Sequence, residues 1–123
     1  MARGSWQDCS ELTLFLPIND LEECTAAQAV LGVLTERVGG FTRSAMEGDG
    51  RFVGRYKTGT NPAGFIDDHV LVVLVLLRSA TSEAVNSHVA HLHELVHDEY
   101  AAQERAQEAV WIVAHSSRVF CEE

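Results

Sequence analysis

The stretch HVLVVLVLL at residues 69–77 decides the fold, because every residue in it after His69 is apolar. Such a run is far too short to span a membrane, but it suits a strand that is buried on both faces. The turn-forming residues RSATS (78–82) follow it, and Thr81 or Ser82 is suited to cap a helix. Beyond the cap, apolar residues at helical spacing predict an amphipathic helix: Val85, Val89, Leu92, Val96 and Tyr100.

A similar strand and helix precede this stretch. In ELTLFLP (11–17) every second residue is leucine, which predicts a strand that the final proline ends. Asp20 or Thr25 is a suitable cap for the next helix, and Gly39 with Gly40 ends it. The apolar stripe of that helix is Ala27, Val30, Leu31, Leu34 and Val38.

Two further strands complete the predicted order. RFVGRY (51–56) follows a turn-rich connection at residues 41–50, and AVWIVA (109–114) follows the second helix. The order strand, helix, strand, strand, helix, strand has one compact solution, the ferredoxin-like α+β sandwich. We therefore expect a four-stranded antiparallel sheet with strand order 4-1-3-2 and both helices on one face.

A chain of 123 residues is expected to form one domain. We expect a flexible N-terminal arm at residues 1–10, a single α+β domain at residues 11–115 and a C-terminal tail at residues 116–123. The first residues contain no apolar segment of the kind found in signal peptides, so we expect no secretion signal.

Charge and cysteine content limit the partners and the compartment. The chain has 18 acidic and 9 basic residues, for a formal net charge of −9. Because an acidic surface repels phosphate backbones and anionic lipids, we expect neither nucleic acid nor membrane as a partner. Cys9, Cys24 and Cys121 share no C-x-x-C spacing, which favours reduced thiols in a cytoplasmic protein. The glycines form no nucleotide-binding pattern, and we expect no cofactor.

The second face of the predicted sheet is unusually apolar. A ferredoxin-like sheet has helices on one face only, so its other face normally carries polar residues. In residues 69–77 both alternating sets are apolar, and Phe15 adds to the second face. Exposed patches of this kind are rare on monomers, so we expect a homodimer or higher assembly with the sheets facing each other. The alternative is that the tails or the loop at residues 57–68 cover this face.

The second helix also contains HELVH (93–97), which has the H-E-x-x-H pattern of zinc hydrolases. His93 and His97, one helical turn apart, would bind the metal, and Glu94 would accept a proton from metal-bound water. At about 100° per residue, however, both histidines lie on the flank of the apolar stripe, and Glu94 points away from the core. The competing interpretation is a solvated, acidic helix flank, and catalytic residues stay unassigned.

A third metal ligand would have to come from another element. In the expected topology the second helix ends beside the start of the third strand, which places His97 and Asp98 near residues 67–69. The side chains expected at this end of the sheet are Asp20, Asp67, Asp68, His69 and Glu108.

Short motifs along residues 25–115 also carry a family resemblance: Gly40-Phe-Thr42, Gly50-Arg-Phe52, Gly64-Phe-Ile66, Tyr100 and Gln107-Glu108-Ala-Val110. The chain resembles a bacterial family of small uncharacterised domains with Gly-x-Thr, Gly-x-aromatic, Gly-x-Ile-x-acid, and then Tyr followed by Gln-Glu-x-Val. It departs from the family in having Phe52 where tryptophan is usual, and in the expected lack of a secretion signal. The resemblance implies a ferredoxin-like α+β domain and no particular activity.

Three functions stay open at this point. The first is non-catalytic binding of a small ligand or a protein partner by a homo-oligomer. The second is a small enzyme with its cavity between sheet and partner, as in dimeric α+β barrels; a pocket lined by Arg55, Tyr56 or Trp111 would favour it. The third is a metal-dependent hydrolase that uses His93, Glu94 and His97.

Overall fold

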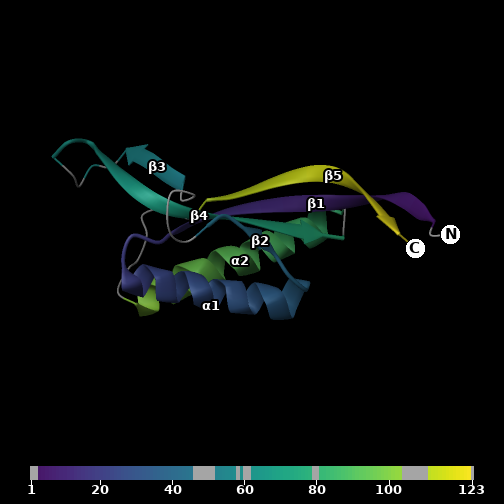
Figure 1. The fold of residues 1–123 in the computed structure, drawn as a ribbon, viewed down its shortest axis with the longest axis horizontal. Coiled ribbons are helices and arrows are strands. Elements are labelled where there is room, and N and C mark those ends of the chain that lie inside the picture. The colour runs from purple at the N-terminus through teal and green to yellow at the C-terminus, as the bar shows by residue number, and fades with distance from the viewer. Residues whose placement is uncertain are drawn as a thin grey trace.

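The computed structural model describes residues 3–45, 52–57, 59, 62–78, 81–103 and 111–122. Over these residues the chain is an α+β domain with two helices and an antiparallel sheet of five strands. Both helices lie against the same face of the sheet (Figure 1). The elements in chain order are β1 (Gly4–Pro17), α1 (Leu21–Val38), β2 (Thr42–Arg43), β3 (Phe52–Lys57), β4 (Phe65–Leu77), α2 (Ser82–Ala102) and β5 (Ile112–Glu122).

Strands β1 and β4 form the centre of the sheet. They pair from Ser10 opposite Leu77 to Pro17 opposite Val70, and β5 pairs with the other side of β1. Both β2 and β3 pair with β4, the first near its end and the second at its start. The strand order is β2-β4-β1-β5, with β3 joined to β4 as a branch.

The described sheet has five strands where the sequence predicted four. The additional strand, β2, lies in the segment predicted to be a turn-rich connection. Gly39 and Gly40 have positive φ angles of 86° and 150°, and the chain turns back there toward β4. Ser44 then holds this segment in place: its backbone N–H donates to the Val72 carbonyl at 3.0 Å, and its hydroxyl accepts from the Val72 N–H at 3.0 Å.

The terminal segments also differ from the prediction. Residues 4–10, predicted as an arm, belong to β1, and residues 116–122, predicted as a tail, belong to β5. The two segments pair with each other from Gly4 opposite Glu122 to Ser10 opposite Ser116. Each supplies the backbone partners of the other, which is why they form strands without an alternating apolar pattern.

The helix boundaries follow the predicted capping residues. Asp20 precedes α1, and its carboxylate accepts a hydrogen bond from the Glu23 backbone N–H at 2.8 Å. Thr25, the alternative cap, lies inside the helix. Gly39 ends α1 in the left-handed conformation, and Thr81 caps α2 through its hydroxyl. No helix in the described ranges is long and apolar enough to cross a membrane.

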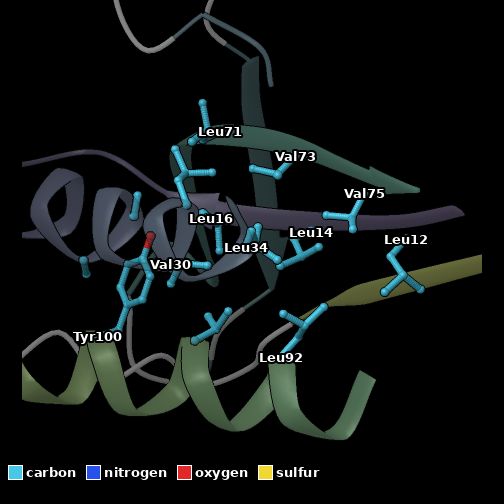
Figure 2. Close-up of a cluster of buried hydrophobic side chains, with 14 of the residues drawn as sticks. Leu12, Leu14, Leu16, Val30, Leu34, Leu71, Val73, Val75, Leu92 and Tyr100 are labelled. Atoms are coloured by element: carbon cyan, nitrogen blue, oxygen red, sulfur yellow. The ribbon is translucent and has the colours of Figure 1, made fainter. Parts of the chain in front are cut away.

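The hydrophobic core lies between the sheet and the two helices (Figure 2). The predicted stripes of both helices supply one side of it, and the helix-facing residues of β1 and β4 supply the other. Its central members are Leu12, Leu14, Leu16, Val30, Leu34, Leu71, Val73, Val75, Leu92, Val96 and Tyr100.

Tyr100 is the largest fully buried side chain, and it ties the end of α2 to the β1–α1 junction. Its ring rises from α2 into the core (Figure 2), and its hydroxyl donates to the Pro17 carbonyl at 2.7 Å. Burial raises the pKa of Tyr100 above its usual range, and nearby Glu23 and Cys24 raise it further.

The substitution Tyr100→Phe tests this link. It removes the Tyr100 donor from the partly buried Pro17 carbonyl, so we expect the free energy of unfolding to fall by about 1–2 kcal/mol. Urea denaturation measures the loss. Tyr56→Phe is the matched control, since Tyr56 is only partly buried, and its effect should stay below about 0.5 kcal/mol. Equal losses in both variants would contradict the role of the Tyr100 hydroxyl.

Tyr100 also predicts a difference in alkaline stability. Because its pKa is raised on folding, the folded chain keeps the phenolic proton at a pH where the unfolded chain loses it, near pH 10. Its contribution is therefore complete below about pH 10 and is lost as the pH rises further. Between about pH 10 and 11, wild-type stability should fall by about 1 kcal/mol more than that of Tyr100→Phe. Parallel stability curves would refute this prediction.

Candidate functional site

The sheet face opposite the helices is the candidate functional surface. Side chains alternate along a strand, so the β1 residues between the buried leucines point to this open face. Thr13 lies at its centre, with Leu74 of β4 on one side and Val113 of β5 on the other. Leu74 is 37% exposed, Leu76 is 42% exposed and Val113 is 38% exposed. We call the apolar residues of this region the open-face patch: Phe15, Val72, Leu74, Leu76 and Val113.

The tails and the loop at residues 57–68 were the alternative covering for this face. In the described part of the chain they do not shield the patch. Residues 116–122, which the sequence assigned to a tail, pair along the edge of β1 instead of crossing the sheet. The loop before β4 also leaves Leu74 and Leu76 exposed to solvent. The open face is therefore apolar and accessible, as the two-sided pattern of residues 69–77 indicated.

Exposed apolar residues also lie on the β3–β4 hairpin. Ile66 and Val72 are an even number of residues apart on β4, so their side chains point to the same face of the sheet. Ile66 is 37% exposed. Phe52, opposite Val70, is 55% exposed. Figure 1 shows β3 and the start of β4 rising away from the helical layer. Because Asp68 and the buried Val70 lie between Ile66 and Val72 on this side of β4, the exposed apolar residues form two groups, one on the hairpin and one at the centre of the sheet.

Tyr56 stands at the far end of this surface. Its ring folds back over Gly54, where a Cβ atom would overlap the tyrosine hydroxyl. Gly54 is opposite Asp68, so the phenol and this carboxylate lie on one side of the hairpin. Partial burial, and after it the charge of Asp68, raises the pKa of Tyr56 above its usual value. Gly54 therefore provides the space in which the Tyr56 ring lies.

A polar corner joins β1, α1 and β4 nearby. The Asn19 side chain accepts a hydrogen bond from the His69 N–H at 2.6 Å and donates one to Asp68 at 2.8 Å. The Ile18 N–H donates to the His69 carbonyl at 3.0 Å. Of the residues expected at this end of the sheet, Asp68 and His69 are joined through the side chain of Asn19, which precedes Asp20 in the chain.

Arg55 and Asp67 form an ion pair on the other side of the hairpin. Arg55 donates two hydrogen bonds to the Asp67 carboxylate, at 2.7 and 3.0 Å, and its guanidinium lies 4.2 Å from the centre of the Phe65 ring. The Arg55 hydrogen bond holds the pKa of Asp67 below its usual value, and the same bond raises the pKa of Arg55. Both side chains are exposed, so this pair orders the hairpin more than it stabilises the fold.

The H-E-x-x-H residues lie on the solvent side of α2. His93, Glu94 and His97 are all exposed, and the Nδ1 atom of His97 lies 3.4 Å from the Asp98 carboxylate. A groove of about 290 Å³ lies between α1 and α2. Of the three residues only Glu94 lines this groove; the histidines that line it are His88 and His91.

The arrangement does not provide the third ligand that the sequence suggested. Asp67 is held by Arg55, and Asp68 is held by Asn19. Glu108 lies outside the described residues. Across the described ranges, no three His, Cys, Asp or Glu side chains come close enough together to hold a metal ion. Metal binding by His93, Glu94 and His97 therefore stays a prediction, and the described residues offer no third protein ligand for it.

Some features of the surface could not be found from the sequence. Trp111, predicted to lie in a strand, precedes β5 and is 59% exposed. Trp6, in the predicted arm, packs edge-to-face on Phe120 with ring centres 5.4 Å apart. The only sequence signal for that pair was an aromatic residue near each end of the chain.

Comparison of the chain with protein-family models, with curated proteins and with solved structures found no match.

Zinc analysis tests the remaining metal hypothesis. Because the described residues offer no third ligand, we expect protein purified without a metal column to contain less than about 0.2 equivalents of zinc. A chelator should leave its melting temperature unchanged, and His93→Ala with His97→Ala should not alter the zinc content. Stoichiometric zinc that is lost in this double variant would contradict the expectation.

Proposed function

We propose that the chain is a non-catalytic binding domain that works as a homo-oligomer assembled through the open-face patch, and that it binds a small ligand or a protein partner. The observation that carries this proposal is the exposure of Leu74, Leu76 and Val113 at the centre of the sheet. A second copy is the occupant best suited to an apolar face, since each copy removes the same apolar surface of the other from water.

The open face sets the size of this assembly. β1 pairs with β4 along residues 70–77, a length of about 26 Å. With β5 beside them, these three strands are about 14 Å wide. This area is below the roughly 800 Å² per partner that stable protein interfaces bury, so the contact also needs the exposed apolar residues of the β3–β4 hairpin. Each Å² of apolar surface removed from water would contribute about 25 cal/mol before the costs of association.

The chemistry around the patch favours apolar contact over catalysis. Its five members carry no charge, and the nearest ionisable residues of the same face are Glu11 and His115 at its rim. Arg55, Tyr56 and Trp111 would have favoured an enzyme with a cavity between sheet and partner. Arg55 lies on the other side of the hairpin, in its ion pair with Asp67, and Tyr56 lies at the far end of the open face, so neither stands at the centre of the patch. A dimeric α+β-barrel enzyme is therefore the second candidate, and a metal-dependent hydrolase is the third.

We also propose that the fold is a variant of the ferredoxin-like arrangement. The pairings of β3 with β4, β4 with β1 and β1 with β5 support it, because these four strands taken in chain order would give the order 4-1-3-2. On this proposal β2 is an addition beside the end of β4. The resemblance to small bacterial α+β domains agrees with it. A cytoplasmic location is supported by the cysteines, since all three lie in described ranges and none forms a disulfide.

Leu74→Glu tests the proposed assembly. Each copy would bring a carboxylate into the contact, so we expect the weight-average molar mass at low micromolar concentration to fall. Light scattering coupled to size-exclusion chromatography measures the change. Leu21→Glu is the matched control: Leu21 is 80% exposed at the start of α1, away from the patch, and this variant should keep the wild-type mass. An unchanged mass in Leu74→Glu would refute the open-face contact.

A further inference from the structure

Beyond the helices, β1 and β5 continue as a two-stranded ribbon made of residues 4–10 and 116–122, which we call the terminal ribbon. Figure 1 shows both strands passing the ends of the helices and reaching the two termini. One side of this ribbon carries Trp6, 60% exposed, and Phe120, 57% exposed. Two large aromatic side chains therefore lie together in solvent where the helical layer no longer covers them.

β5 also forms an outer edge of the sheet. Its sequence IVAHSSRVFCE contains neither proline nor glycine, and its outer side pairs with no strand among the described residues. The opposite edge is divided between β2 and β3 and carries Arg43, Arg55 and Lys57. Interruptions and basic side chains are common devices that keep an edge from pairing with another chain. Compared with the edge formed by β2 and β3, the β5 edge therefore has fewer features that prevent pairing with another chain.

We propose that a second copy of the chain pairs antiparallel with this edge, across a twofold axis at Phe120. In that register Arg118 of each copy lies opposite the partner's Glu122, so the contact contains two pairs of unlike charge. Phe120 lies opposite its own copy. Since Trp6 is the neighbour of Phe120 within the chain, the four aromatic rings form one continuous row across both ribbons.

The side chains involved are available for this contact. Arg118 is 64% exposed; it lies 5.1 Å from the Trp6 ring centre and 4.0 Å from Asp8, a distance at which the ion pair is weak. Glu122 is exposed and forms no ion pair within the described ranges. An unlike charge across the axis would give Glu122 a partner and Arg118 a second one.

The shape of the molecule leaves room for the second copy. Phe120 is the third residue from the end of β5, and both helices lie toward the other end of β1 (Figure 1). Antiparallel pairing about Phe120 would therefore place the two helical layers at opposite ends of the dimer, without a clash. This contact uses a strand edge and leaves the open-face patch uncovered, so it is independent of the assembly proposed above.

Disulfide cross-linking reports this register directly. Val119 would lie opposite the partner's Cys121, and directly opposed residues of antiparallel strands are 4.5–5.5 Å apart at Cα, which suits a disulfide. Under mild oxidation, full-length Val119→Cys is expected to form a covalent dimer on a non-reducing gel. Wild type and the double variant Val119→Cys with Cys121→Ser should remain largely monomeric on the same gel.

Charge reversal in the Val119→Cys background then tests the two ion pairs. Arg118→Glu or Glu122→Arg alone would place like charges opposite each other twice, so each should slow cross-linking about fivefold. The combined reversal restores unlike pairs and should return the rate to within about twofold of the starting value. Arg118→Gln, which removes attraction without adding repulsion, should slow it about twofold. Circular dichroism checks that each variant keeps its fold.

The result that overturns the proposal is the absence of a covalent dimer in Val119→Cys. A combined reversal that cross-links as slowly as the worse single variant would also overturn it, because the charges would then act only within one chain. Since Leu74 is not in this contact, Leu74→Glu should leave the cross-linking rate unchanged. The ribbon contact and the open-face contact can thus fail separately.

Discussion

The antiparallel pairing of β1 with β4 is the constraint on which the rest of the structure depends. A one-residue slip would move every side chain of a strand to the other face of the sheet. β4 does not oppose such a slip by itself, since both of its faces are apolar. β1 opposes it, because its leucines alternate with Glu11 and Thr13. The Asn19 side chain also constrains the register, since its hydrogen bonds to His69 and Asp68 hold β4 at one position along the β1–α1 junction.

Tyr100 connects the second helix to the same junction. Its hydroxyl reaches the Pro17 carbonyl, next to the residues that set the register of β4. The end of α2, the start of α1 and the centre of the sheet are therefore joined within a few residues. These contacts all lie on the helix side of the sheet or at its end, and they leave Leu74, Leu76 and Val113 of the other face exposed.

The sequence predicted the parts of the fold that depend on local pattern. The α+β class, both helices, their caps at Asp20 and Thr81 and the central strands follow from apolar spacing and capping residues. The terminal ribbon could not be predicted, because residues 4–10 and 116–122 are strands only through each other. The Arg55–Asp67 pair was missed for a similar reason: it depends on the register of β3 against β4, which no local pattern specifies. The H-E-x-x-H string, by contrast, was visible in the sequence, but its environment was not.

Two surfaces remain that the folded chain does not use for itself, one on the face of the sheet and one along its edge. The face is apolar and uncharged at its centre, and its burial by a second copy is the central claim of this account. Sedimentation equilibrium of the Arg118→Glu variant, in which the ribbon contact is disfavoured, tests that claim most directly at low micromolar concentration. If the open faces pair, the variant has a mass of at least two chains of about 13.5 kDa each. A single-chain mass at every concentration up to about a hundred micromolar, where even weak interfaces assemble, would contradict it.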